Sequence, residues 1–211
     1  MRSRLLVLAL TALSACAEGE RDETAQYTAA LNAYYADNPE CVRVGRPVDD
    51  DGVVFKVMEA EASQNRETAK LDALVSAGLL TVRTVDIETP DFRTGNTVPE
   101  AERRYVLTEM GRAALAPQAL AGRGRRGASQ FCYGHREVTA VLRSTEPADA
   151  VGAKVTSVTY SYELSYVADW ASRDAVRAAF PGIWVAADGP AEDTDELVLT
   201  NEGWVRHGAK L

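Results

Sequence analysis

The segment from Lys154 to Val167 carries the most restrictive pattern in the sequence, a strict alternation of apolar and polar side chains. Successive side chains of a strand point to opposite sides, so the apolar set shares one face. A strand with one apolar and one polar face is typical of an antiparallel sheet that covers a core. The apolar face consists of Val158, Tyr160, Tyr162, Leu164 and Tyr166, and the polar face of Ser157, Thr159, Ser161, Glu163 and Ser165.

The residues on either side extend this pattern, so we expect a β-rich region over 131–211. Side chains alternate again from Val138 to Leu142, and a last strand is predicted from Glu196 to Thr200. Asp169 to Phe180 has the spacing of a short amphipathic helix. The sequence therefore predicts a mainly antiparallel sheet with one short helix in this half of the chain.

Helical spacing is the main signal in the region 25–115. A first helix is predicted to end before Asn38-Pro39, because the residue that precedes a proline disfavours helical backbone. We interpret its aromatic face as part of a core, and this face consists of Tyr27, Leu31, Tyr34 and Tyr35.

Residues 66–115 predict a helix, a strand, a polar loop, a second strand and a second helix, in that order. Thr108 is placed to cap the second of these helices. The pattern consists of the helix face Leu71, Leu74 and Val75, the left-handed position Gly78, the strand Leu79–Ile87, the loop with Pro90, Gly95 and Pro99, the strand Arg104–Thr108, and the helix from Glu109.

Two parts of this pattern carry a family resemblance, Leu71-Asp72-Ala73-Leu74-Val75-Ser76-Ala77-Gly78-Leu79-Leu80 and Tyr105-Val106-Leu107-Thr108-Glu109-Met110-Gly111-Arg112. They are similar to the last helix, the wing and the following helix of winged-helix transcription regulators. The resemblance is confined to residues 66–115 and implies a local winged-helix-like fold. We therefore expect an α+β chain, with a helical, winged-helix-like part over 25–115 followed by the mainly antiparallel β part with its short helix.

The first fifteen residues have the order of a secretory signal. A basic start, Met1-Arg2-Ser3-Arg4, precedes the apolar run Leu5 to Ala12, and small residues follow it. The apolar run is too short to cross a bilayer core of about 30 Å as a helix. We interpret residues 1–15 as a targeting signal that is removed.

Leu13-Ser14-Ala15-Cys16 closes this signal. It resembles the lipobox of bacterial lipoproteins, which implies cleavage before Cys16 and lipidation of that cysteine, with 16–24 as a polar tether. Ala17 stands where an aspartate would suggest inner-membrane retention, so the resemblance implies the outer membrane. Two or three acyl chains give stable anchoring. The alternative is a plain signal peptide that ends near a cysteine.

Net charge narrows the range of partners. The formal net charge is −8 at pH 7, and removing residues 1–15 makes it more negative, because that segment contains two arginines. DNA binding needs several basic side chains that neutralise phosphates. We therefore expect no nucleic-acid partner and keep a winged-helix DNA-binding protein only as a third hypothesis.

Residues 116–130 differ in composition from both neighbouring regions. Glycines interrupt alanines there, which is typical of a flexible linker. An alternative is a basic patch that contacts anionic lipid or lipopolysaccharide phosphate. The residues of this patch would be Arg112, Arg123, Arg125 and Arg126.

Cysteine usage agrees with an exported chain. If Cys16 carries lipid, Cys41 and Cys132 remain, and an oxidising periplasm allows them one intramolecular disulfide. Two buried free thiols are the alternative. A metal site is less favoured, because only His135 and His207 are available to join the two thiols.

The usual catalytic motifs are absent from the sequence. It contains no Gly-x-Ser-x-Gly, no Ser-x-x-Lys, no His-Glu-x-x-His and no Gly-x-x-x-x-Gly-Lys. Cys132 and His135 are three residues apart, which on a strand places them on opposite faces. We single out no catalytic residue, and we expect no cofactor.

An acidic cluster precedes the last predicted strand and contains oxygen atoms of the kind that calcium binds. Because Gly189 and Pro190 lie within it, we interpret it as a solvated loop and predict no metal site. The carboxylates of a glycosidase meet in space and not in sequence, so a dispersed hydrolase site stays open. The cluster consists of Asp188, Glu192, Asp193, Asp195 and Glu196.

These observations favour a non-enzymatic interaction or structural module of the cell envelope, held by lipid at the periplasmic face of the outer membrane. Its partner would be an envelope protein or the cell wall. The alternative is an envelope hydrolase with a dispersed carboxylate site. A deep pocket lined by converging carboxylates or by His135 would favour the enzyme, and a shallow surface with an apolar patch would favour the module.

Overall fold

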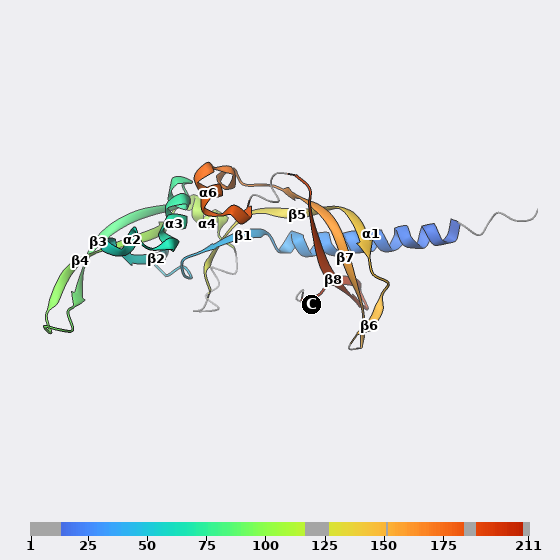
Figure 1. The fold of residues 1–211 in the computed structure, drawn as a ribbon, viewed down its shortest axis with the longest axis horizontal. Coiled ribbons are helices and arrows are strands. Elements are labelled where there is room, and N and C mark those ends of the chain that lie inside the picture. The colour runs from blue at the N-terminus through green and yellow to red at the C-terminus, as the bar shows by residue number, and fades with distance from the viewer. Residues whose placement is uncertain (1–13, 117–126, 151, 184–188, 209–211) are drawn as a thin grey trace, which may run out of the picture. The chain divides into compact units, whose positions relative to one another are not determined.

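Figure 1 shows the fold in the computed structural model, which describes residues 14–116, 127–150, 152–183 and 189–208, with side chains from Asp22 onward. The chain forms two compact units, and each draws on both halves of the sequence. The expected linker, 116–130, stays a prediction, because its central part, 117–126, lies outside the described residues. The first unit consists of Met1–Asp37, Glu137–Glu163 and Pro190–Leu211, and the second of Asn38–Arg136 and Leu164–Gly189.

The first unit is an antiparallel sheet that curls around one long helix, α1 (Ser14–Asp37). The helix contacts four strands in turn: Asn32 bonds to Val138, Tyr35 to Tyr160 and Asp195, and Tyr27 packs on Trp204. Because one helix reaches all four of these strands, the sheet curves around it. The strand order is β5 (Ser129–Ser144, second half), β7 (Ala153–Ser165), β8 (Ala191–Thr200) and β9 (Gly203–Arg206), and β6 (Ala148–Ala150) pairs with β7.

The core of this unit confirms the alternation read from the sequence. Val158, Tyr160 and Tyr162 are buried on β7, and Tyr27, Leu31 and Tyr35 are buried on α1. The helix ends at Asp37, immediately before Asn38-Pro39, as the proline predicts. Two members of the alternating set behave differently. Thr159 is buried, and Tyr166 lies beyond the end of the strand and is 91% exposed.

The second unit contains a three-stranded antiparallel sheet in the order β2 (Val53–Met58), β4 (Thr97–Leu107) and β3 (Leu80–Pro90). Strand β1 (Glu40–Val44) pairs with the first half of β5. The helical segments among its described residues are α2 (Glu59–Ala62), α3 (Arg66–Ser76), α4 (Glu109–Ala114), η1 (Asp169–Ser172), α6 (Asp174–Ala179) and η2 (Pro181–Ile183).

A single apolar cluster holds the second unit together. It joins α3, β3, β4, β5 and the segment around α6, which are distant in sequence. Gly111 allows α4 to approach Leu79, the residue before β3, because a Cβ at position 111 would lie 2.0 Å from the Leu79 carbonyl oxygen. The fully buried members with the largest side chains include Tyr105, Phe131, Leu71, Leu74, Leu79 and Leu80.

The expected fold class is wrong. Region 25–115 is not a helical, winged-helix-like part, because it contains four strands, and its helices after α1 are no longer than the 11 residues of α3. The polar loop expected around Pro90, Gly95 and Pro99 instead extends β3 and β4 to 11 residues each. Both prolines lie on the outer part of the hairpin, where no third strand needs their missing N–H groups. The chain is mostly β, with a curled antiparallel sheet.

The second half of the chain also differs from expectation in detail. The helix expected over 169–180 is divided at Arg173 into η1 and α6. The acidic cluster is not a solvated loop throughout, since Glu192 to Glu196 belong to β8. The capping prediction is confirmed, because Thr108 Oγ1 accepts a 3.0 Å hydrogen bond from Gly111 N. Gly78 has a φ of 84°, as expected for a residue that follows a helix.

Candidate functional site

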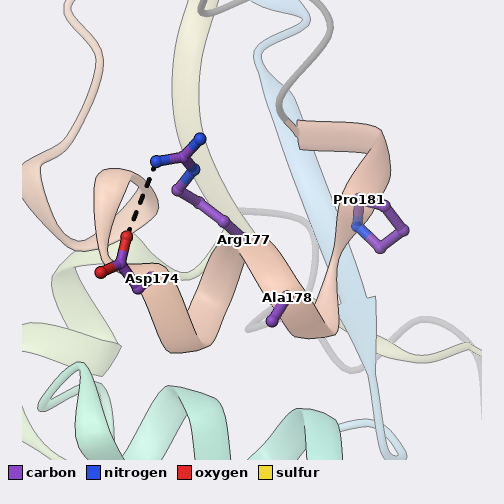
Figure 2. A pocket seen from close by; sticks show the side chains of 4 residues that line it. All are labelled: Asp174, Arg177, Ala178 and Pro181. Carbon is purple, nitrogen blue, oxygen red and sulfur yellow. Dashed lines mark ion pairs between the residues drawn. The ribbon is translucent and has the colours of Figure 1, made fainter.

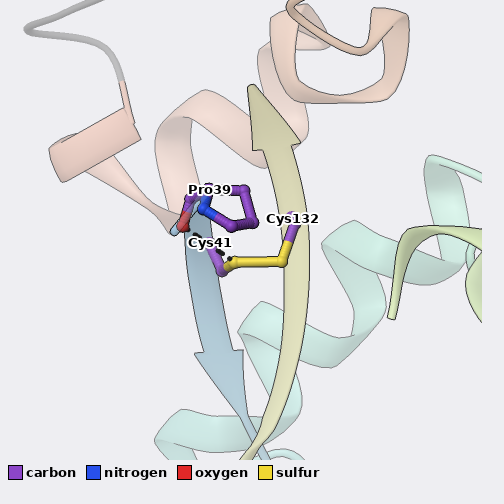
Figure 3. Close-up of a disulfide and its surroundings, with 3 residues drawn as sticks. All are labelled: Pro39, Cys41 and Cys132. Carbon is purple, nitrogen blue, oxygen red and sulfur yellow. Dashed lines mark hydrogen bonds between the residues drawn. A yellow bond between two sulfur atoms is a disulfide. The ribbon is translucent and has the colours of Figure 1, made fainter. Parts of the chain in front are cut away.

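The predicted disulfide is confirmed. Cys41 and Cys132 are direct partners on β1 and β5, and a bond joins their sulfur atoms (Figure 3). Their Cα atoms are 3.9 Å apart, which is closer than the roughly 4.4 to 6.8 Å of most disulfides. The Pro39 carbonyl oxygen lies 3.3 Å from Cys41 Sγ. Because Cys132 is bonded, it is not a free thiol beside His135.

Among the residues of the predicted lipidation site and basic patch, only Arg112 has a described side chain. Cys16 belongs to the first part of α1, and its side chain lies outside the described residues. Arg112 is exposed on α4, where its guanidinium approaches Gly52. Arg123, Arg125 and Arg126 lie outside the described residues. The lipidation site and the basic patch therefore stay predictions.

A buried polar cluster in the first unit was missed by sequence reasoning. We call it the tyrosine–aspartate cluster, and it consists of Tyr34, Tyr35, Tyr160, Asp195 and Arg206 from α1, β7, β8 and β9. Asp195 Oδ2 accepts hydrogen bonds from Tyr35 (2.6 Å) and Tyr160 (2.8 Å). Asp195 Oδ1 accepts a 2.8 Å hydrogen bond from Arg206 Nε. The cluster thus connects the helix to three strands.

The hydroxyl groups of Tyr35 and Tyr160 supply two hydrogens, but there are three short oxygen–oxygen contacts among these hydroxyls and Asp195. The Tyr35 and Tyr160 hydroxyls are 2.6 Å apart, and both lie near Asp195 Oδ2. Two of the three contacts are therefore hydrogen bonds at any moment. Arg206 also lies over the Tyr34 ring, 4.5 Å from its centre, in a cation–π arrangement.

The ionisation of the cluster follows from its burial and its partners. Burial raises the pKa of Asp195, but hydrogen bonds from Arg206, Tyr35 and Tyr160 outweigh it, so the pKa lies below the ordinary value. Burial, together with hydrogen bonds to Tyr35 and Asp195, raises the pKa of Tyr160. Asp195 stays ionised and Tyr160 stays protonated near neutral pH, so neither exchanges protons there. The arrangement is suited to holding α1 against the sheet.

A hollow of about 410 Å³ lies at the surface of the second unit, beside α6 and η2 (Figure 2). It is lined by Asp174, Arg177, Ala178 and Pro181. Arg177 Nη1 lies 3.6 Å from Asp174 Oδ1, so the carboxylate in this hollow is paired with an arginine. Among the residues that the structure describes, the lining of the hollow includes one carboxylate, that of Asp174, and does not include His135.

The outer part of the β3–β4 hairpin is an exposed element of the second unit. Pairing of β2 with β4 stops at Glu102, so residues 86–101 form a ribbon of only two strands, which we call the hairpin arm. Figure 1 shows the β3–β4 ribbon extending beyond β2 and the helices of this unit. Across 86–101, all of which the structure describes, no residue is buried.

The turn of the arm presents an aromatic side chain to water. Phe92 is 96% exposed. Sequence reasoning placed it in a polar loop and missed it. Its neighbours Asp91 and Arg93 are charged, but this pattern does not show whether the aromatic side chain points to water or to a core. Single exposed apolar residues are common on proteins. Phe92 therefore indicates a contact site only in combination with its position on the turn of the hairpin arm.

Comparison with known proteins gives no match to a protein family, to a curated protein or to a solved structure. Among the described side chains, no three His, Cys, Asp or Glu residues are grouped so that they could hold a metal ion. Within the same part of the chain, no helix has the length and apolar character that a membrane span requires.

Proposed function

We propose that this chain is a lipid-anchored, non-enzymatic interaction module of the cell envelope, and that the hairpin arm is its contact element. The single observation that carries this proposal is the arm itself, a two-stranded ribbon with Phe92 on its turn. The anchor would be lipid on Cys16, at the periplasmic face of the outer membrane. The partner would be an envelope protein or the cell wall.

The arm is difficult to explain as part of the folded core. A two-stranded hairpin is marginally stable in water unless a third strand or a helix covers it. Residues 86–90 extend about 16 Å beyond the last three-stranded position, at roughly 3.3 Å per residue, and none is buried. The hairpin arm adds exposed surface without adding to the core, and binding to another molecule would explain why it is present.

The envelope location is supported by the sequence of the first sixteen residues and by the disulfide. The order of basic, apolar and small residues before Cys16 is that of a lipoprotein signal. A disulfide between Cys41 and Cys132 fits an oxidising compartment, because such bonds are rare in the reducing cytosol.

The lipid anchor is tested by metabolic labelling. Radiolabelled palmitate should enter the wild type and not Cys16→Ser, because only the first cysteine of the mature chain would be acylated. A matched control is the double variant Cys41→Ser/Cys132→Ser, which keeps Cys16 and should stay labelled. Label that persists in Cys16→Ser would contradict the anchor.

The contact role of the arm is tested with a shortened arm in the same cells. Asp86 and Ala101 are direct partners, so Asn-Gly in place of residues 87–100 joins them by a two-residue turn. In detergent extracts of envelopes, the wild type should migrate as a complex larger than the purified protein, and the shortened variant should not. Equal migration of the two chains would contradict the proposal, provided that their thermal midpoints agree.

A further inference from the structure

We propose that Phe92 is the anchor of the hairpin arm and that it enters an apolar pocket with a basic rim on a partner protein. This inference rests on the proposed function, because it assigns a partner chemistry to the same arm. Interface anchors are typically aromatic side chains that fill a pocket, surrounded by residues that exclude water.

The turn that carries Phe92 is ordered by its own hydrogen bonds. Asp91 N donates to Asn96 O (2.8 Å), and Asp91 Oδ1 accepts from Arg93 N (2.9 Å). Asp91 Oδ2 accepts from the Thr94 hydroxyl (2.8 Å), and Gly95 closes the turn with a φ of 74°. Because the backbone around Phe92 is already fixed, binding loses little conformational entropy.

The net negative charge of the hairpin arm favours a partner whose pocket has a positively charged rim. The hairpin arm carries four carboxylates along its length, those of Asp86, Glu88, Asp91 and Glu100, against the one guanidinium of Arg93. Hydrogen bonds from Arg93 N and Thr94 keep the pKa of Asp91 below its ordinary value, so this residue is ionised. An acidic arm is attracted to a basic rim and is repelled by anionic lipid. These charges favour a protein pocket over a membrane surface.

The strand edges of the arm are less suited to binding than its turn. Charged residues and proline on an edge strand discourage the addition of another strand. Strand β3 is the edge of its sheet and carries Asp86 and Glu88, and the outer part of β4 carries Pro99. Pairing with a second copy of this chain through these edges is therefore disfavoured, and side chains at the turn remain to make the contact.

The test places a photoreactive group beside Phe92 in the full chain. A lysine analogue that bears an aliphatic diazirine replaces Asn96, and the cells are irradiated. A matched control carries the same analogue at Asn201, which is exposed on the β8–β9 turn. We expect one protein adduct from position 96 and none of that mass from position 201. The crosslinked partner peptide should contain apolar residues flanked by lysine or arginine.

Further substitutions decide whether Phe92 and the acidic residues act as proposed. Phe92→Ala should lower the adduct yield by at least about tenfold, as expected for truncation of an interface anchor, whereas Phe92→Leu should retain most of it. Glu88→Lys/Glu100→Lys should lower the yield as well. Because all three side chains are exposed, the variants should keep the thermal midpoint of the wild type.

Several outcomes would overturn the inference. These are no adduct at position 96, an adduct of phospholipid mass, an adduct with the mass of two copies of this chain, or a protein adduct that Phe92→Ala leaves unchanged. If the shortened arm abolishes the envelope complex while Phe92→Ala does not, the contact role of the arm stands and the anchor role of Phe92 fails. If neither variant affects the complex, both proposals fail.

Discussion

Asp195 is the residue on which most of the buried polar contacts of the first unit converge. It is 9% exposed, and it accepts hydrogen bonds from side chains on α1, β7 and β9. The sequence places it among other acidic residues, which favours the interpretation of a solvated loop. Its position two residues before the buried Leu197 better indicates that Asp195 points inward, because residues two apart on a strand share a face.

Replacing Asp195 with alanine should destabilise the fold strongly. The variant removes the carboxylate that pairs with Arg206, and it leaves one of the two hydroxyls of Tyr35 and Tyr160 without an acceptor. We expect the free energy of unfolding to fall by about 3 kcal/mol. Urea unfolding measures this change. Glu192→Ala on the same strand, where the side chain is exposed, is the control and should change the free energy by less than about 0.5 kcal/mol. A similar effect of the two substitutions would contradict the assigned role.

The same residue predicts a dependence of stability on pH. Its pKa in the folded protein lies below the ordinary 3.8, because the hydrogen bonds from Arg206 and the tyrosines outweigh the effect of burial. A lowered pKa contributes stability above the unfolded pKa, and this contribution is lost as the pH falls through the folded pKa. The free energy of unfolding of the wild type should therefore exceed that of Asp195→Asn at pH 7, and the difference should shrink below pH 3.8. A constant difference, followed by urea unfolding at each pH, would count against the ionised cluster.

At the scale of elements, the disulfide joins the short strand β1 to the first half of β5. It closes a loop with a sequence separation of 91 residues. The chain-entropy account of such a loop gives a stabilisation of roughly 4 to 5 kcal/mol, and removing native disulfides typically costs about 2 to 5 kcal/mol.

Cys132→Ser should therefore lower the thermal midpoint of the purified protein clearly. Calorimetry checks this change, with Cys41→Ser/Cys132→Ser as the control for an unpaired thiol. Wild type treated with a thiol reductant should unfold at the same temperature as the double variant. An unchanged midpoint in both variants would show that the bond does not stabilise the second unit.

The elements that could be predicted are those whose signal is local. The alternation on β7, the cap at Thr108 and the turn at Gly78 each depend on a few neighbouring residues. Strand β9 and the full length of β8 escaped prediction, because their inward faces are set by α1, which lies at the other end of the chain. The sequence predicts a loop in place of the hairpin arm, because Pro90 and Pro99 usually interrupt strands. They are tolerated here because no third strand pairs with this part of the hairpin.

The candidate contact residue illustrates a further limit. Nothing in the pattern around Phe92 distinguishes an exposed aromatic residue from one that folds back onto a core. Its exposure follows from the long pairing of β3 with β4, which extends from Leu80↔Leu107 to Pro90↔Thr97. That register depends on both strands together, so the exposure of Phe92 cannot be predicted from the residues of the turn alone.

At the scale of the whole molecule, the two compact units are interleaved along the chain. Each unit combines segments from the start and the end of the sequence, and β5 and β7 each contribute residues to both. Expression of 25–115 alone should therefore give no folded product, since the second unit also needs β5 and the segment around α6 for its core. Far-ultraviolet circular dichroism of this fragment checks the expectation. A cooperative melt would show that the fragment is independent.

The first unit also sets the order of events when the protein is made. Tyr34 on α1 and Arg206 on β9 are 172 residues apart, yet they bond to each other. The aromatic side of α1 is synthesised first, and the sheet that covers it is complete only when β9 is available, 172 residues later. Until then, the aromatic face of α1 is exposed to water and can promote aggregation. Whether the chain folds or aggregates then depends on how soon β9 becomes available, or on a chaperone that shields these tyrosines until it does.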